Sequence, residues 1–174
     1  MMEVESDIPA AAANAIQSNV GLIIEPEFRN FVYRENTIER ENWEIALGSS
    51  QVKLFERILQ SVYGDVSVES SIANVGNFEL ALTPKLTDMQ LATPGETGFA
   101  FFEAWLNYAV TIQRDDQSNP RVTTITAYGK ENKTRFQRLQ QGLNEAIENA
   151  LRDAGAKLTI LLTSKQKESA PPGG

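Results

Sequence analysis

The chain has 174 residues and a formal net charge of −7, and it contains no cysteine and no histidine. The length suits a single domain that buries its core without disulfides, none of which can form. Without Cys and His, the usual ligands of zinc, haem and copper and the common nucleophile–base pairs are missing, so we expect no cofactor, no metal site and no enzyme. The acidity argues against nucleic-acid binding.

The first third of the chain predicts a tether followed by short strands. Residues 1–18 are polar and Ala-rich, which predicts a flexible N-terminal tether. The apolar run VGLII at 20–24 predicts an inner strand that is buried on both faces. Residues 28–34 fit either a helical turn or a strand, and WEIAL at 43–47 alternates as a strand does.

A helix and a further strand are predicted next. Segment 50–63 carries one apolar stripe at helical spacing, which predicts an amphipathic helix capped by Ser49 or Ser50 and ended by Gly64. The stripe consists of Val52, Phe55, Ile58, Leu59 and Val62. DVSVE at 65–69 alternates as a strand should.

The middle of the chain predicts a bent strand between two loops. Residues 73–77 are expected to form a loop, and 78–91 a half-buried strand in which the apolar phase changes. That change predicts a bulge or bend near Asp88. Residues 93–98 contain two glycines and a proline and are expected to be a long mobile loop.

The stretch FAFFEAWLNYAVTIQ at 99–113 predicts the central strand of the sheet. It is rich in aromatic and β-branched residues, and turn-forming letters at 115–120 separate it from RVTTITAYG, so the two runs predict a β-hairpin. The even positions of the first run, from Phe102 to Ile112, are all apolar and are expected to face the core. The odd positions face the other side.

The last predicted element is a long amphipathic helix. An apolar stripe runs from Phe136 to Leu158, and Asn132 or Thr134 would cap its start. Gly155 could end this helix, with 158–162 as a final strand, and that alternative stays open here.

These elements predict an α+β two-layer sandwich. A mostly antiparallel sheet of about five strands would carry two amphipathic helices on one face, and its other face would need water or a partner. The domain is expected to span 19–163, between the tether at 1–18 and a disordered tail at 164–174.

A partner site is predicted on the odd face of the central strand. Phe99, Phe101 and Trp105 are not needed for the even-face core, so they would form an apolar patch for a partner or lipid, unless a loop, the first strand or the N-terminal segment covers them. Gly95 and Glu96 belong to the neighbouring loop and are expected to contact the same partner.

A weaker candidate is a basic cluster around the start of the last helix. Lys130, Lys133, Arg135 and Arg138 lie close together in sequence in an otherwise acidic chain. A helix N-terminus favours anions, so a phosphate or a lipid head group could bind there. The alternative is a solvated basic face without a ligand.

Three segments also resemble a known family. VGLIIEPEFRNFVYRE, WEIALGSSQVKLFERIL and ALTPKLTDMQL, followed by a long hairpin and a closing helix, resemble the mature soluble part of small Gram-negative envelope lipoproteins over about residues 19–160. That group includes transport-auxiliary lipoproteins and the lipopolysaccharide-assembly lipoprotein. The resemblance implies a non-catalytic accessory domain on the periplasmic side of the outer membrane, which binds an envelope protein or lipid. In such proteins a lipid on a Cys is the only membrane attachment, and this sequence contains no Cys.

Two other functions remain open at this point. The chain could be a structural subunit of an oligomeric machine, such as a phage-tail or secretion component, with Phe101 and Trp105 packed between subunits. A carboxylate-based hydrolase using Glu96 and Glu103 is the third possibility.

Overall fold

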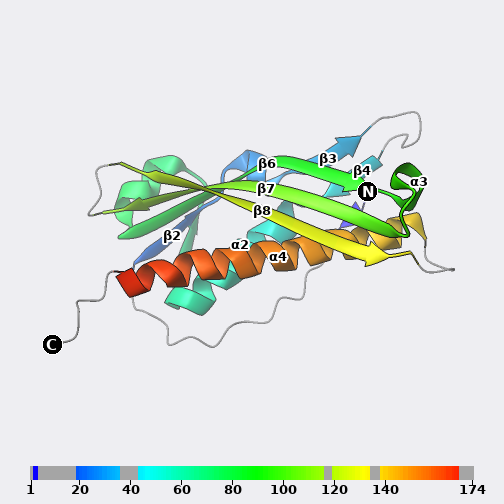
Figure 1. Ribbon diagram of the computed structural model, residues 1–174. Helices are drawn as coiled ribbons and strands as arrows, with labels where there is room; N and C mark the ends of the chain where they lie inside the picture. The colour runs from blue at the N-terminus through cyan, green and yellow to red at the C-terminus, as the bar shows by residue number, and fades with distance from the viewer. Residues whose placement is uncertain (1, 4–18, 36–42, 116–118, 134–137, 169–174) are drawn as a thin grey trace.

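The fold consists of a five-stranded sheet with two helices on one face. The computed structural model describes residues 2–3, 19–35, 43–115, 119–133 and 138–168. The strands follow the order β5–β2–β6–β7–β8, and Figure 1 shows helices α2 and α4 together on one side of them. Their bounds are β2 Val20–Ile23, α2 Gly48–Tyr63, β5 Val66–Glu69, β6 Leu80–Ala92, β7 Phe101–Arg114, β8 Arg121–Asn132 and α4 Leu139–Glu168. The predicted α+β two-layer sandwich is confirmed.

The sheet combines parallel and antiparallel pairs. Strand β2 runs parallel to both of its neighbours, β5 and β6, whereas β6, β7 and β8 form an antiparallel meander. All four residues of β2 are buried, as predicted for an inner strand. The predicted irregularity in β6 is also confirmed, because its register with β7 shifts between Leu86 and Asp88.

A second, smaller sheet was not predicted. It has the order β1–β4–β3, with β1 parallel and β3 antiparallel to the central strand β4. Its bounds are β1 Met2–Glu3, β3 Val32–Glu35 and β4 Trp43–Ala46, and the short helix α1, Pro26–Arg29, precedes β3. The ambiguous segment 28–34 therefore contains both a helical turn and a strand, and β1 lies inside the predicted tether, the rest of which is outside the described residues.

The core lies between the large sheet and the two helices. The even positions of β7 are buried without exception from Phe102 to Ile112, as the alternation predicted. Gly129 of β8 allows α4 to approach the sheet closely, since a Cβ at this position would collide with the backbone of Ala146 and Ala150. Gly142 of α4 also allows a close approach, since a Cβ at this position would collide with the ring of Phe102.

Helix α4 is continuous to Glu168, so the alternative strand at 158–162 is wrong. Gly155 does not end the helix, because this glycine faces Leu54 and Ile58 of α2, where a Cβ would lie 3.0 Å from Leu54 Cδ1. Close packing of the two helices there outweighs the roughly 1 kcal/mol that glycine costs in a helix. The helix also extends into the predicted tail, whose last residues lie outside the described part of the chain.

The predicted cap of α2 is wrong, and so is Asn132 as the cap of α4. Asn132 is the last residue of β8 and does not cap α4, and Thr134 is outside the described residues. At α2 the N-cap position is Leu47, so Ser49 and Ser50 lie inside the first turn. Gly64 does end α2, with a φ of 85° that glycine adopts easily.

Candidate functional site

The large sheet has a second face, opposite α2 and α4, and one end of this second face is covered by a short helical segment. Residues 73–77, expected to be a loop, belong to the 3₁₀ helix η1, Ile72–Asn77. Val75 of η1 packs with Ile23 and Ala81, and Phe78 joins this small cluster. Among the described residues, this cover lies on the half of the sheet where β6 begins and β7 ends.

The other half of this face carries a group of aromatic side chains that we call the aromatic face: Phe99, Phe101, Trp105 and Tyr128. Phe99 is 60% exposed and stacks on Phe101, with ring centroids 5.4 Å apart and planes 2° apart. Trp105 lies beside Tyr128 with centroids 5.4 Å apart. The predicted residues Phe101 and Trp105 thus do lie on the face opposite the core, and both are half-buried.

Tyr128 is a member of the face that the sequence reading missed. It pairs with Trp105 in the register between β7 and β8, and its hydroxyl donates a hydrogen bond of 2.7 Å to Glu103. Partial desolvation and the neighbouring Glu103 carboxylate raise the pKa of Tyr128 to about 12. Alternation in RVTTITAYG could have placed Tyr128 on this face, but only the register shows that it meets Trp105.

The segment 93–98, expected to be a loop, contains a short helix. Helix α3, Pro94–Thr97, has a capping box in which the Glu96 carboxylate accepts hydrogen bonds of 2.7 Å from the backbone N–H and the hydroxyl of Thr93. Gly98 ends the turn with a φ of 71°, and Gly95 is exposed. The Thr-x-x-Glu spacing was a readable sequence signal for this cap. Glu96 is therefore engaged in holding the turn.

Of the four predicted anion-binding residues, the three described ones lie in two places, Lys130 on β8 and Lys133 with Arg138 near the start of α4. Lys130 lies in β8, and its ammonium is 5.5 Å from the centroid of the Phe101 ring, so it belongs to the aromatic face. The backbone N–H of Lys133 donates to Ala100, and the carbonyl of Arg138 accepts the first bond of α4 from Gly142. Arg135 is outside the described residues. The prediction that Lys130 lies at the helix start is wrong, because β8 continues to Asn132.

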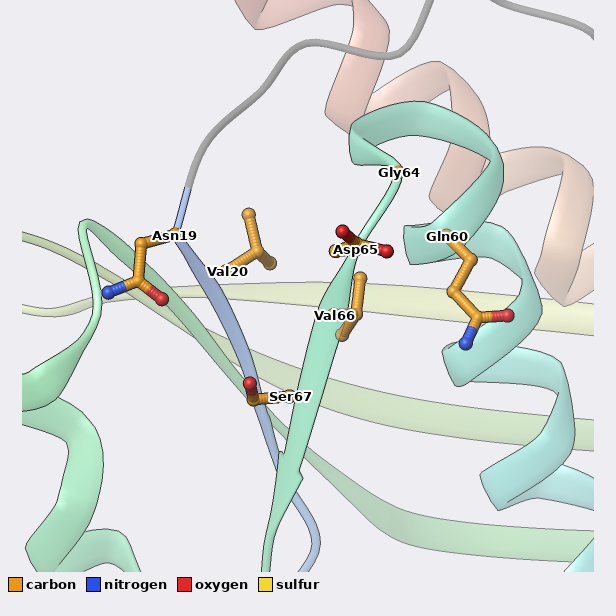
Figure 2. A pocket seen from close by; sticks show the side chains of 7 residues that line it. All are labelled: Asn19, Val20, Gln60, Gly64, Asp65, Val66 and Ser67. Atoms are coloured by element: carbon orange, nitrogen blue, oxygen red, sulfur yellow. The ribbon is translucent and has the colours of Figure 1, made fainter.

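Two cavities lie away from the predicted site residues. One, of about 470 Å³, opens between the starts of β2 and β5 and the end of α2, where Figure 2 shows Asn19, Asp65 and Gln60 around it. The other, of about 530 Å³, lies between α1 and β6 and is lined by Phe28, Phe31, Pro84, Leu86 and three charged side chains. Ser67 and Asp65 both line the first cavity, but no hydrogen bond between them is described. Among the described residues, no acidic cluster suits a metal ion.

Comparisons with known proteins find similar folds only. No family model and no curated protein match the sequence. Among solved structures, a DUF330-family protein from Xanthomonas campestris is 12% identical with a TM-score of 0.51, covering 98% of this chain and 97% of its own. Rare lipoprotein B from Shewanella oneidensis is 10% identical with a TM-score of 0.51, covering 85% and 97%. A Caulobacter crescentus protein described as a lipoprotein is 7% identical with a TM-score of 0.50, covering 88% and 93%.

These identities show a shared fold and nothing finer. The chain therefore has an architecture that also occurs in Gram-negative lipoproteins. None of the described helices is long and apolar enough to cross a membrane.

Proposed function

We propose that this chain is a non-catalytic accessory domain of the Gram-negative cell envelope that binds a protein partner through the aromatic face. One observation carries the proposal: four aromatic side chains lie together on the half of the sheet that η1 leaves uncovered. Contiguous aromatic patches with a polar rim are typical of protein-binding surfaces.

The rings of this face are already held in the positions that a partner would meet. Phe99 and Phe101 are stacked on each other, Tyr128 is fixed by Glu103, and Lys130 lies over Phe101. Ordered side chains lose little conformational entropy on binding, so more of the contact energy contributes to affinity. Aromatic residues of this kind commonly supply most of the binding energy at interfaces.

The envelope location rests on the sequence resemblance and on the fold. Two of the solved structures with this fold carry the name lipoprotein. The chain has no cysteine, so we place the lipid attachment on a segment that precedes these residues. This location predicts that the native gene product fractionates with the envelope; recovery in the cytosol would contradict it.

Photo-crosslinking in the native cell tests the partner. A photoreactive residue at Thr126, which is exposed on the aromatic face, is expected to crosslink one envelope protein, and Trp105→Ser should remove that product. The same probe at Arg57, which is exposed on α2, is the matched control.

Two outcomes would overturn the proposal. A product linking two copies of this chain, together with a large species in size-exclusion chromatography, would favour a structural subunit of an oligomeric machine. Equal products from Thr126 and Arg57 would show that the aromatic face has no special role.

A further inference from the structure

The end of the molecule where β7 and α4 begin carries a second kind of exposed surface. Phe99 is 60% exposed and Leu139 is 45% exposed, although both are large apolar residues. Lys133 and Arg138 are exposed beside them. We call these four residues the tip.

Backbone and core contacts bring the segments of the tip together. The N–H of Lys133 donates a hydrogen bond of 2.8 Å to Ala100, next to Phe99. Gly142 of α4 lies against the ring of Phe102, which places the first turn of the helix, with Leu139, beside the start of β7. Three chain segments thus present apolar and basic side chains at one end.

Two exposed cations lie at the tip of a chain that is acidic as a whole. The chain has a net charge of −7, but Lys133 and Arg138 form no described ion pair. Two carboxylates near the tip, Glu96 and Glu131, accept hydrogen bonds within the chain, Glu96 as the cap of α3 and Glu131 from the Asn132 N–H at 3.0 Å. Exposed cations next to apolar side chains suit an anionic lipid surface. The cations contact the lipid phosphate groups, and the apolar side chains contact the acyl chains.

The tip lies at the same end of the molecule as the N-terminal strand. Figure 1 shows β4, α3 and the start of α4 at one end of the sheet, and β1 pairs with β4. A lipid attached upstream of β1 would therefore hold this end towards the bilayer.

We propose that the tip docks on the surface of an anionic lipid bilayer, with Phe99 and Leu139 entering the interface and Lys133 and Arg138 contacting phosphate groups. The proposal extends the function proposed above and rests on it for one point only, that the chain lies next to a membrane in the cell. Vesicle binding itself is measured without a lipid anchor. Removal of one basic residue is expected to weaken such binding about fivefold.

Co-sedimentation of the full chain with phosphatidylglycerol-rich vesicles is the test. We expect binding to these vesicles and little binding to pure phosphatidylcholine vesicles. Leu139→Ser and Lys133→Gln should each weaken binding about fivefold or more. Val122→Ser and Ile160→Ser are matched controls, since these residues are 61% and 65% exposed elsewhere and should leave binding unchanged.

Absence of binding to the anionic vesicles would overturn the proposal, as would equal losses in the tip variants and the controls. Retained circular dichroism spectra exclude unfolding as the cause. If the tip variants bind vesicles normally but lose the protein crosslink formed at Thr126, the tip belongs to the protein-binding surface and the lipid proposal is wrong. If Trp105→Ser removes the crosslink but not vesicle binding, both proposals stand separately.

Discussion

Leu106 and Trp105 are neighbours in β7 but lie on opposite faces of the sheet. Leu106 is fully buried beneath the helices, whereas Trp105 is half-buried beside Tyr128 on a face that the described residues cover only at its far end. Every buried even position of β7 belongs to the core cluster that also contains buried residues of α2 and α4. The aromatic residues at odd positions have no such structural role, and this difference makes the second face the better candidate for function.

Replacing each of these two neighbours by alanine should separate the faces most clearly. Leu106→Ala removes a side chain that is 0% exposed and should lower the free energy of unfolding by about 2–5 kcal/mol, because it leaves a cavity. Trp105→Ala removes fewer contacts and should cost about 1 kcal/mol or less. Urea unfolding measures both, and similar losses would show that the second face is also part of the core.

The features predicted correctly from the sequence depend on local periodicity. Alternation in β7, the apolar stripe of α2 and the phase change near Asp88 each follow from side chains close together in the chain. The same alternation placed Phe101 and Trp105 on the face opposite the core. These signals reflect burial on one side of an element, and that burial is confirmed for β7 and α2.

The features that were missed depend on contacts between distant segments. Strand β1 is only two residues long and exists through its pairing with β4, and the parallel placement of β2 beside β6 has no local sequence signal. Gly155 continues the helix because α2 packs against it. In the site, Tyr128 meets Trp105 through the β7–β8 register, which the sequence alone does not specify.

The close approach of α4 to the core face of the sheet gives a second way to test the difference between the two faces. Gly129→Ala would place a Cβ against the backbone of α4, which cannot rotate away, so we expect a loss of about 1–3 kcal/mol in unfolding free energy. Gly76→Ala is the control, because no atom lies within 4 Å of a Cβ there. An unchanged stability of Gly129→Ala would contradict the packing of α4 on β8.

Side chains of α4 also occupy the free edge of β8. Asn149 donates to the carbonyl of Lys130 at 2.9 Å, Asp153 accepts from the N–H of Tyr128 at 2.9 Å, and Lys157 donates to the carbonyl of Thr126 at 2.7 Å. Four helical residues and two strand residues both span roughly 6–7 Å, so successive bonds stay in step. These contacts occupy groups through which another strand could pair.

Asp153→Ala should cost about 1–2 kcal/mol, because Asp153 also binds Lys157 at 2.7 Å and both contacts are lost. Asp153→Asn keeps an acceptor for the Tyr128 N–H and should cost less. Urea unfolding compares the two, and light scattering checks whether the alanine variant associates through the exposed edge. Equal stability of Asp153→Ala and the parent chain would show that the edge contacts contribute nothing.

The smallest expected effect concerns the Tyr128–Glu103 contact on the aromatic face. Partial desolvation and Glu103 raise the pKa of Tyr128 from its ordinary value of 10.0 to about 12. Because the folded chain favours the neutral phenol, this contribution to stability is complete below about pH 10 and is lost as the pH rises through about 12. Glu103→Gln keeps an acceptor without the charge and should lower the pKa of Tyr128 towards 10.0.

Absorbance titration of tyrosinate, taken as the difference from Tyr128→Phe, measures that pKa, with circular dichroism at each pH to confirm that the chain stays folded. A downward shift in Glu103→Gln would show that the hydroxyl and the carboxylate meet in solution, so that the ring beside Trp105 is fixed before any partner binds. An unshifted titration would mean that Tyr128 moves freely. The aromatic face would then differ from the helix-covered face in order as well as in exposure, and a partner would have to fix the ring on binding.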